Sequence, residues 1–564
     1  VDNNKETIDN LRLWDYRPLK RTYSQLQNFR TYYQFNDVDT DRYKLNGKTE
    51  QVMLSARELD PDALPEKSQT WVNRHLVYTH GFGLAMSPVS KVTEEGFPEF
   101  YVKNVPPTTT KQGIDISQPR IYYGEETDDY VIVNTKTSEL DYPSGNKNVY
   151  NNYQADGGVE INSLLDRVLF AYRFASPQIL FSGSIDSNSR IQFTRSIQER
   201  VRKITPFFKF DDDPYLVAGA DSFYWIYDGY TTSSRFPYSE HVYYRGEKVN
   251  YMRNSVKVAI NAYTGDMKFY VADQDDPLVQ TYSNMFPSLF QPMNEMPNNL
   301  EQHIRYPEDY FTIQTRSYFD YHMTDPKVFY NIEDQWEAPE EKLRGRTAEV
   351  EPYYVMMKLP GEDKAEFMLV QPFKPRGREN MIGWVGARSD QPNYGEMRAY
   401  LFSKQKLIYG PSQIESRIDQ DTEISQKMTL WSQRGSSVFR GNLLAIPINN
   451  SMMYFEPIFL ESSGKGSLPQ LKRVIIAQGD RLVMEQTVDQ ALDSLFGARS
   501  VEDKPAESPK IEPEQDQQKP SPQLQQKLDQ IRSTYQEARD ALNQGNLQGY
   551  AEQMQQFEQE LEQL

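Results

Sequence analysis

Short β-forming runs alternate with turn-forming residues along most of this chain, and this limits its fold more than any other feature. Val256–Tyr263 and Met267–Val271 are runs of this kind, and residues 264–266, Thr-Gly-Asp, have the composition of a tight turn. Asn46-Gly47 is an equally strong hairpin signal near the start of the chain. Such short turns join antiparallel strands, because a parallel pair needs a crossover of a dozen or more residues. The pattern therefore predicts mainly antiparallel sheets.

Helical periodicity interrupts the β-forming runs at a few places. Glu160–Phe174 is predicted to be a helix. Its apolar stripe consists of Leu164, Leu165, Val168, Leu169 and Tyr172. Ile414–Trp431 is predicted to be helical as well. The predicted fold class is α+β, with mainly antiparallel β sheets and interspersed helices, plus a C-terminal antiparallel helical hairpin.

The chain of 564 residues exceeds one ordinary core, so we expect several domains. Residues 1–339 are predicted to form an N-terminal α+β domain, and residues 340–497 a second, largely β domain. Residues 498–522 are rich in proline and charge and have no periodicity, which is typical of a disordered linker. Residues 523–564 contain two amphipathic segments, which predict the helical hairpin.

The predicted hairpin at 523–564 is expected to need a partner. Two helices bury little apolar surface by themselves, and most helical stability in proteins comes from tertiary packing. From Val501 onward the chain carries 13 acidic and 6 basic residues, so this arm is itself acidic. We expect the hairpin to dock on the body of the chain, on a sister subunit or on another protein.

The acidic composition excludes some classes of partner. A formal net charge of −18 and a pI near 5.0 leave no basic footprint for nucleic acid, and they argue against electrostatic attachment to anionic lipid. The chain contains no cysteine, which excludes disulfides, thiol catalysis and cysteine-ligated metal sites. No run of about twenty apolar residues predicts a transmembrane helix, and no signal-peptide pattern opens the sequence.

Trp71–Val89 is the stretch densest in tryptophan, histidine and glycine, and we predict a buried strand at residues 76–78 that enters a glycine turn. Residues 80–83, His-Gly-Phe-Gly, imitate the oxyanion loop of α/β-hydrolases, but the chain has no Gly-x-Ser-x-Gly elbow. His75 and His80 are five residues apart, which suits neither one helix face nor one strand face as a metal pair. We therefore prefer a packed core histidine and a structural turn.

Three aspartates, Asp37, Asp39 and Asp41, alternate in a predicted strand and would share one face of it. They imitate the front of a calcium-binding loop, but Arg42 and Lys48 stand where an EF-hand needs glycine and glutamate. A solvated strand face is the preferred interpretation, and calcium bound by the three carboxylates is the alternative. No other cofactor is predicted. The acidic loop at residues 211–213 is a further source of oxygen ligands for calcium, although exposed turn chemistry is preferred there too.

Five long motifs resemble those of a known bacterial family. They are NLRLWDYRPL at 10–19, DVDTDRY at 37–43, QVMLSAREL at 51–59, TWVNRHLVYTHGFG at 70–83 and RNSVKVAINAYTG at 253–265. The chain is similar over nearly its whole length to uncharacterised protein family 0182, large multi-spanning membrane proteins. The resemblance implies an N-terminal bundle of membrane helices, which this chain lacks, followed by a large extracytoplasmic domain. The family has no established activity, so the resemblance implies no catalytic or binding residue.

The function expected from the sequence is a binding or assembly role in an extracytoplasmic soluble domain of a cell-membrane protein. An enzyme is not favoured, because no complete catalytic constellation occurs. One alternative is a cell-envelope enzyme that acts on a polymer such as a glycan, with paired carboxylates from unlinked loops. Another is a calcium-stabilised scaffold. The expected partners are the membrane, through an N-terminal region absent here, and a protein or a second copy at the hairpin.

Overall fold

A computed structural model describes most of the chain. It covers residues 4–497 apart from 146, 344, 404, 406, 434, 449, 450 and 465, and in the last segment it covers 533, 534, 537, 549 and 553–556. Residues 1–498 form one compact unit and residues 499–564 form a second. The predicted linker at 498–522 lies outside the described residues, and so does nearly all of the predicted hairpin.

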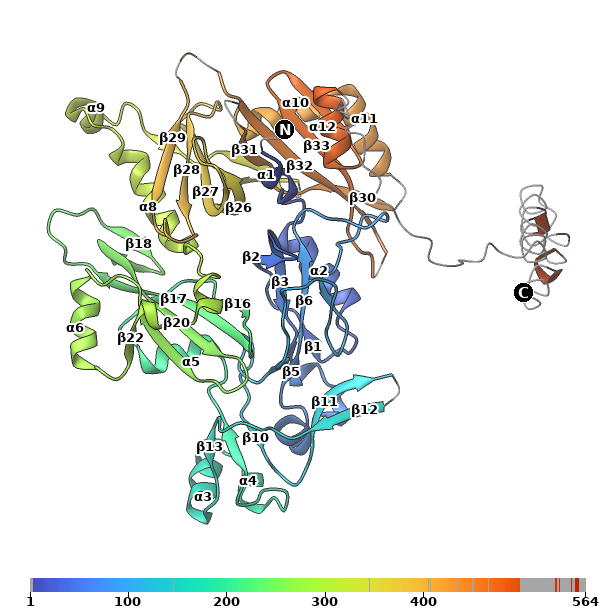
Figure 1. Cartoon of the computed structure of the whole chain (residues 1–564), viewed down its shortest axis with the longest axis vertical. Helices are drawn as coiled ribbons and strands as arrows, with labels where there is room; N and C mark the ends of the chain where they lie inside the picture. Colours follow the sequence, from blue (N-terminus) through green and yellow to red (C-terminus); the bar gives the residue numbers. More distant parts are fainter. Residues whose placement is uncertain are drawn as a thin grey trace, which may run out of the picture. The chain divides into compact units, whose positions relative to one another are not determined.

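The first two large sheets come from the first 300 residues (Figure 1). The N-terminal sheet is antiparallel and has the order β2 (Asp39–Leu45), β3 (Lys48–Ala56), β6 (Leu84–Pro88), β7 (Val102–Lys103) and β8 (Thr108–Thr109). The second sheet has the order β15 (Lys209–Phe210), β17 (Phe223–Ser233), β20 (Tyr251–Asn261), β21 (Met267–Val271) and β22 (Phe290–Pro292), with β16 (Tyr215–Ala218) also paired to β17. Only the β21–β22 pair of these sheets is parallel among the described strands.

Two further antiparallel sheets follow. The third has the order β23 (Trp336–Glu337), β27 (Ala365–Pro375), β28 (Gly383–Arg388) and β29 (Met397–Leu401), with β26 (Tyr353–Lys358) paired to β27. The fourth has the order β30 (Ser436–Arg440), β32 (Ser451–Ser462), β33 (Gln470–Gln478) and β34 (Arg481–Glu485), with β31 (Leu444–Ile448) paired to β32. Their hairpin connections account for the antiparallel order.

Small sheets complete the β structure. One has the order β10 (Val131–Val133), β14 (Arg190–Gln192) and β13 (Val159–Glu160). The two-stranded pairs are β1 (Tyr33–Gln34) with β4 (Glu58–Leu59), β5 (Gly81–Phe82) with β9 (Arg120–Ile121), β11 (Glu139–Ser144) with β12 (Lys147–Asn151), β18 (Val242–Tyr244) with β19 (Glu247–Val249), and β24 (Glu340–Leu343) with β25 (Arg346–Glu349).

Helices are interspersed among the strands, which confirms the α+β class. They are α1 (Lys5–Asp9), α2 (Tyr16–Leu26), α3 (Leu164–Arg173), α4 (Gln178–Phe181), α5 (Ile197–Ile204), α6 (Pro277–Met285), α7 (Asn298–Glu301), α8 (Glu308–Tyr321), α9 (Pro326–Asn331), α10 (Pro411–Gln420), α11 (Thr422–Trp431) and α12 (Val488–Phe496). Short 3-10 turns occupy Pro61–Ala63, Glu66–Ser68 and Met293–Glu295, and a π-helical turn occupies Asn73–Val77. No described helix is both long enough and apolar enough to cross a bilayer.

Strand β3 is buried on both of its faces, and this organises the core. Val52 and Leu54 pack in the cluster shared with the second sheet, together with residues such as Trp225. Met53 points the other way, into the cluster that includes Trp14 and residues of the third and fourth sheets. This is the period-2 alternation of a strand, here with apolar contacts on each side. The division predicted at residue 339 stays a prediction, and the second of these clusters contains residues from both sides of it.

Several element predictions are corrected by the structure. The predicted strand at residues 76–78 is wrong, because Asn73–Val77 is a π-helical turn. The predicted helix Ile414–Trp431 is two helices, since the Asp421 side chain accepts the Ile424 N–H and caps a new helix there. The Asn46-Gly47 hairpin is confirmed by the pairing of Leu45 with Lys48.

Candidate metal centre

Three carboxylates from two distant parts of the chain converge beside β2. Asp37 precedes the strand, Asp39 is its first residue, and Asp213 lies in the loop between β15 and β16. One carboxylate oxygen from each of the three lies within 4.8 Å of the others. Asp39 is buried, whereas Asp37 and Asp213 are half-buried, so the cluster is reached from solvent on one side.

Hydrogen bonds between β2 and β16 hold these carboxylates together. The Leu216 N–H donates to Oδ2 of Asp39 at 3.0 Å, and the Ala218 N–H donates to the Tyr43 hydroxyl at 3.0 Å. Asp39 and Tyr43 therefore satisfy backbone donors of β16. Asp213 lies only two residues before the start of β16, so the same contacts fix the loop that carries it.

Two oxygens of the cluster are buried without hydrogen bonds. Oδ1 of Asp39 and Oδ1 of Asp213 have no hydrogen-bond partner among the described residues. The Asp39 side chain is only 3% exposed, so water does not readily replace the missing partner. A buried polar atom without a partner is rare in folded proteins, and a bound ion is one of the causes that account for it. This observation points to a ligand in a way that acidic composition alone does not.

Arg305 supplies the positive charge next to the cluster. Its guanidinium hydrogen-bonds to Oδ2 of Asp213, lies 3.8 Å from Oδ1 of Asp39, and donates to the Thr40 carbonyl at 3.0 Å. It also lies 4.1 Å from the centre of the Tyr215 ring. Arg305 contacts two of the three carboxylates and offsets one of their three negative charges, so a divalent cation would balance the other two.

Burial and mutual repulsion raise the pKa values of the acids in this region. Burial raises the pKa of Asp39 and of Asp213 well above the ordinary range, and Arg305 offsets only part of this effect. Burial also raises the pKa of Glu125, which feels the charges of Glu58 and Asp39. In such a group the charged form needs a compensating cation, and otherwise the acids hold protons.

The spacing of the three oxygens fits a large, oxygen-liganded ion. Calcium binds oxygen at about 2.3–2.6 Å, so two oxygens on one ion are separated by at most about 5 Å. The three oxygens lie within 4.8 Å of one another, which is compatible with that limit. Magnesium demands near-octahedral geometry and keeps several of its waters, whereas calcium accepts irregular sets of carboxylates. Calcium is therefore the expected ion.

The predicted calcium set of Asp37, Asp39 and Asp41 is divided in the structure. Asp37 and Asp39 are part of the cluster, but Oδ2 of Asp41 lies 2.7 Å from Nδ1 of His303. Asp213 joins the first two instead. The acidic loop at 211–213 was one signal for it, but a sequence gives no sign that residues so far apart meet. Calcium binding itself stays a prediction.

The glycine stretch at residues 80–83 has a structural role. The Phe82 N–H donates to the Arg57 carbonyl at 3.0 Å, and the Gly83 N–H donates to the Pro119 carbonyl at 2.7 Å. These donors are occupied within the protein and do not form an oxyanion hole. His80 is fully buried, as we expected, and lies 3.4 Å from Asp141 and 2.8 Å from the Thr79 hydroxyl. The Thr79 hydroxyl donates to Glu139.

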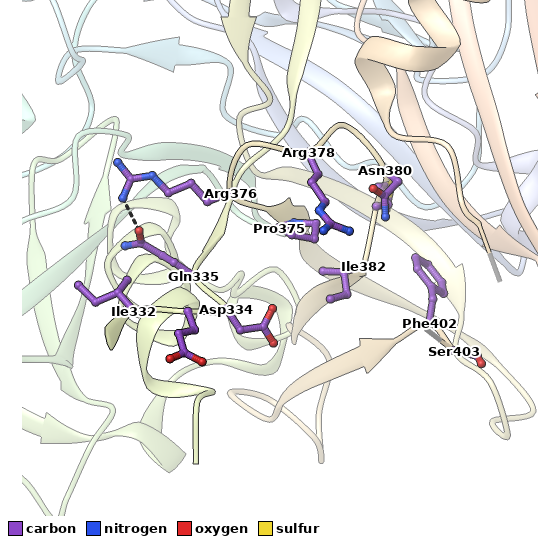
Figure 2. A pocket seen from close by; sticks show the side chains of 12 residues that line it. Ile332, Asp334, Gln335, Pro375, Arg376, Arg378, Asn380, Ile382, Phe402 and Ser403 are labelled. Atoms are coloured by element: carbon purple, nitrogen blue, oxygen red, sulfur yellow. Dashed lines mark hydrogen bonds between the residues drawn. The ribbon is translucent and has the colours of Figure 1, made fainter. Parts of the chain in front are cut away.

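A polar cavity of about 570 Å³ is lined by the segment that follows α9, the connection between β27 and β28, and the residues after β29 (Figure 2). Its lining combines Glu333 and Asp334 with Arg376 and Arg378, so it has no dominant charge. The Arg376 side chain is directed towards Gln335, with which it hydrogen-bonds. The lining includes none of the metal-centre carboxylates, and this mixture of charges does not favour a particular ligand.

Comparisons with known proteins place the chain in a family. The model of an uncharacterised protein family, UPF0182, matches residues 1–431. A UPF0182 protein of Methanospirillum hungatei is 51% identical over 553 residues, which are 98% of this chain and 61% of that protein. A UPF0182 protein of Desulforamulus reducens is 48% identical over 99% of this chain and 60% of its own length.

The match to these relatives is extensive but does not cover them fully. A UPF0182 protein of Trichodesmium erythraeum is 45% identical over all of this chain and 62% of its own length. The chain thus spans about three fifths of the length of these curated relatives. No solved structure matches it. By the extent of the family match and the identity to these relatives, the chain belongs to the uncharacterised protein family UPF0182.

Proposed function

We propose that this chain is a non-enzymatic binding or assembly domain of a membrane protein, on the extracytoplasmic side, and that a calcium ion stabilises it. Asp37, Asp39 and Asp213 would bind the ion. The observation that carries the cation part is the buried Oδ1 of Asp39, which has no hydrogen-bond partner among the described residues and belongs to a group of three close carboxylates. Acids of this kind repel one another unless a cation or protons neutralise them.

The stabilising effect follows from where the ligands come from. Asp37 and Asp39 belong to the N-terminal sheet region, whereas Asp213 precedes a strand of the second sheet. An ion that binds all three connects the two sheets only in the folded state. Ligands that bind only the folded form stabilise it by about 2.7 kcal/mol at about one hundred times the dissociation constant.

A thermal melt tests the cation directly. The melting temperature of the purified chain, freed of metal with a chelator, should rise when calcium is added and rise less with magnesium. Asp37→Asn should remove most of the calcium response. This variant is preferred because the Asp37 carboxylate accepts a local bond, from the Val38 N–H, and an amide oxygen can accept it too. Isothermal titration calorimetry should show one calcium site in the unchanged chain.

Asp212→Asn is the matched control for this melt. Asp212 is the exposed neighbour of Asp213, and it pairs with Arg245 at the surface, where ion pairs contribute little to stability. Its calcium response should equal that of the unchanged chain. If calcium does not change the melting temperature of the unchanged chain, or if Asp37→Asn responds equally, the cation proposal is wrong.

The membrane context is a separate proposal, supported by the family resemblance. The chain has no cysteine, which makes labelling informative. Ser437, an exposed residue of β30, can be changed to cysteine in the full-length protein and treated with a membrane-impermeant maleimide in whole cells. In intact cells, the Ser437→Cys protein is expected to take up more maleimide label than the unchanged protein. Labelling that appears only after lysis would contradict an extracytoplasmic location.

The assembly role is proposed for the predicted hairpin at 523–564. The full-length protein and a variant that lacks residues 523–564 are each purified from membranes. The proteins recovered with them and their oligomeric states are then compared. Loss of a partner or of the oligomer on deletion is expected, because two amphipathic helices bury enough apolar surface only by packing against something else. Unchanged recovery and unchanged oligomeric state would refute this role.

A further inference from the structure

Helices α3 and α4 expose an unusual amount of apolar surface. An apolar stripe like that of Glu160–Phe174 is expected to face a core, but in the structure it faces solvent. The exposed fractions are 71% for Leu164, 66% for Leu165, 43% for Val168, 57% for Leu169, 87% for Tyr172 and, in α4, 79% for Phe181. We call these six side chains the α3–α4 patch. Contiguous apolar surface of this kind marks an interaction site in soluble proteins.

The helix that carries the patch is held firmly by its other side. Phe170 and Phe174 pack on a small core that includes Ile179 and Ile191. The ring of Phe174 stacks on Tyr130 with 4.4 Å between centroids. Ser163 and Asp166 form a capping box at the N-terminus of α3. The exposed stripe is therefore not the face by which α3 packs on this core. A different apolar face of α3 makes those contacts.

The segment that carries the patch is close to neutral. Residues 160–186 contain three acidic residues, Glu160, Asp166 and Asp186, and two basic residues, Arg167 and Arg173, which gives a formal charge of −1. A strongly acidic surface would be repelled by the negative potential of a lipid headgroup layer, whereas a nearly neutral segment is repelled little.

The residue types favour lipid over protein as the occupant. Leucine and valine supply four of the six side chains, and these residues are under-represented among the energetic centres of protein interfaces. Helices that lie in a membrane interface have leucine and phenylalanine on the buried face and basic residues beside them. Tyrosine is also enriched at that depth. Arg173 extends over the Phe193 ring beside the patch.

We propose that the α3–α4 patch docks on a lipid bilayer, with α3 in the plane of the headgroup boundary and its leucines in the acyl region. Burial of apolar surface drives this docking, so it does not require anionic lipid. The proposal does not depend on the cation centre, and its test uses a different measurement.

Flotation with vesicles tests the docking. The 564-residue chain should float with phosphatidylcholine vesicles. The double variant Leu165→Ser with Leu169→Ser should bind at least about tenfold more weakly, because two apolar contacts are removed. Leu430→Ser is the matched control, since Leu430 is 64% exposed on another helix, α11, and it should float like the unchanged chain. Both variants change exposed side chains, and thermal melts confirm that they fold.

A fluorescence measurement adds a positive signal from the patch itself. The emission of Leu169→Trp minus that of the unchanged chain, which has six tryptophans of its own, should shift to the blue when vesicles are added, whereas the same difference for Leu430→Trp should not. Absence of binding by the unchanged chain overturns the proposal. Equal flotation of the double variant also overturns it, as does binding only to vesicles that contain phosphatidylglycerol. Concentration-dependent dimers that the double variant abolishes, without vesicle binding, would assign the patch to a second copy and equally overturn the lipid proposal.

Discussion

Nδ1 of His303 lies 2.7 Å from Oδ2 of Asp41, so Asp41 is bound to His303 and does not join Asp37 and Asp39 in the carboxylate cluster. The other oxygen of Asp41 accepts the Arg42 N–H at 2.7 Å. Both oxygens of Asp41 are therefore hydrogen-bonded, whereas Oδ1 of Asp39, two residues earlier, has no hydrogen-bond partner among the described residues. Asp39 and Asp41 alternate in the same strand, but Asp41 has a structural bond to His303 and Asp39 belongs to the carboxylate cluster. Substitution of Asp41 can test this difference.

Asp41→Asn should destabilise the fold without changing the calcium response. The substitution weakens the buried bond to His303, which we expect to lower the free energy of unfolding by about 1–3 kcal/mol. Melts of this variant with calcium and with chelator should show the same difference between the two conditions as the unchanged chain. A smaller difference would mean that Asp41 contributes to the cation site after all.

Arg305→Met should be strongly destabilising. Arg305 is buried, binds Asp213 and the Thr40 carbonyl, and contacts the Tyr215 ring. Its removal leaves the buried Asp39 and the half-buried Asp213 without their cation, and breaking a buried charged pair costs about 3–5 kcal/mol. Chemical denaturation measures this loss. Arg316→Met is the control, since Arg316 is 65% exposed and should change stability little. Equal losses of stability in the two variants would contradict the claim that the buried contacts of Arg305 stabilise the fold.

Gly81→Ala should destabilise the turn that follows His80. A Cβ at residue 81 would lie 2.3 Å from the Arg57 carbonyl oxygen and 2.8 Å from Cα of Glu58, which are backbone atoms that cannot move aside easily. Overpacking of this kind costs about 1–3 kcal/mol. Gly183→Ala is the control, because no atom of the described residues lies within 4 Å of a Cβ placed there. A melting temperature of Gly81→Ala equal to that of the control would refute the close approach.

Glu341 should make the fold less stable as the pH rises from about 4.5 to about 6. Burial raises the pKa of its carboxyl to about 6, although the Leu443 N–H and Asn442 donate to it. The folded state therefore holds this proton more tightly than the unfolded state, so folding is favoured at low pH. A difference of about 1.5 pKa units corresponds to about 2 kcal/mol, which is lost by the time the pH exceeds about 6.

Denaturation as a function of pH measures the effect of Glu341. Glu341→Gln should flatten the stability profile between about pH 4.5 and pH 6 relative to the unchanged chain. Glu340→Gln, on the exposed side of the same strand, should leave the profile unchanged. Identical profiles for Glu341→Gln and the unchanged chain would show that the folded state does not hold this proton more tightly.

The amino-acid sequence by itself determined the local structure where one segment contains the whole signal. Asn46-Gly47 specifies a hairpin because its residues accept the left-handed backbone of the turn, with φ values of 49° and 82°. The periodicity within Glu160–Phe174 specified helix α3, but the helix begins at Leu164, and Glu160 belongs to strand β13. The alternating runs specified antiparallel sheets. In each case the residues that interact are close in sequence, so the pattern is readable.

The tertiary structure alone decided which residues meet. It paired Asp41 with His303 and brought Asp213 to Asp37 and Asp39 through the hydrogen bond from Leu216 to Asp39. It also directed the apolar stripe of α3 to solvent, because Phe170 and Phe174 occupy the adjoining core. Periodicity shows that a face is apolar but not what covers it. Contacts between distant segments depend on how whole sheets pack, and no single stretch of sequence records that packing.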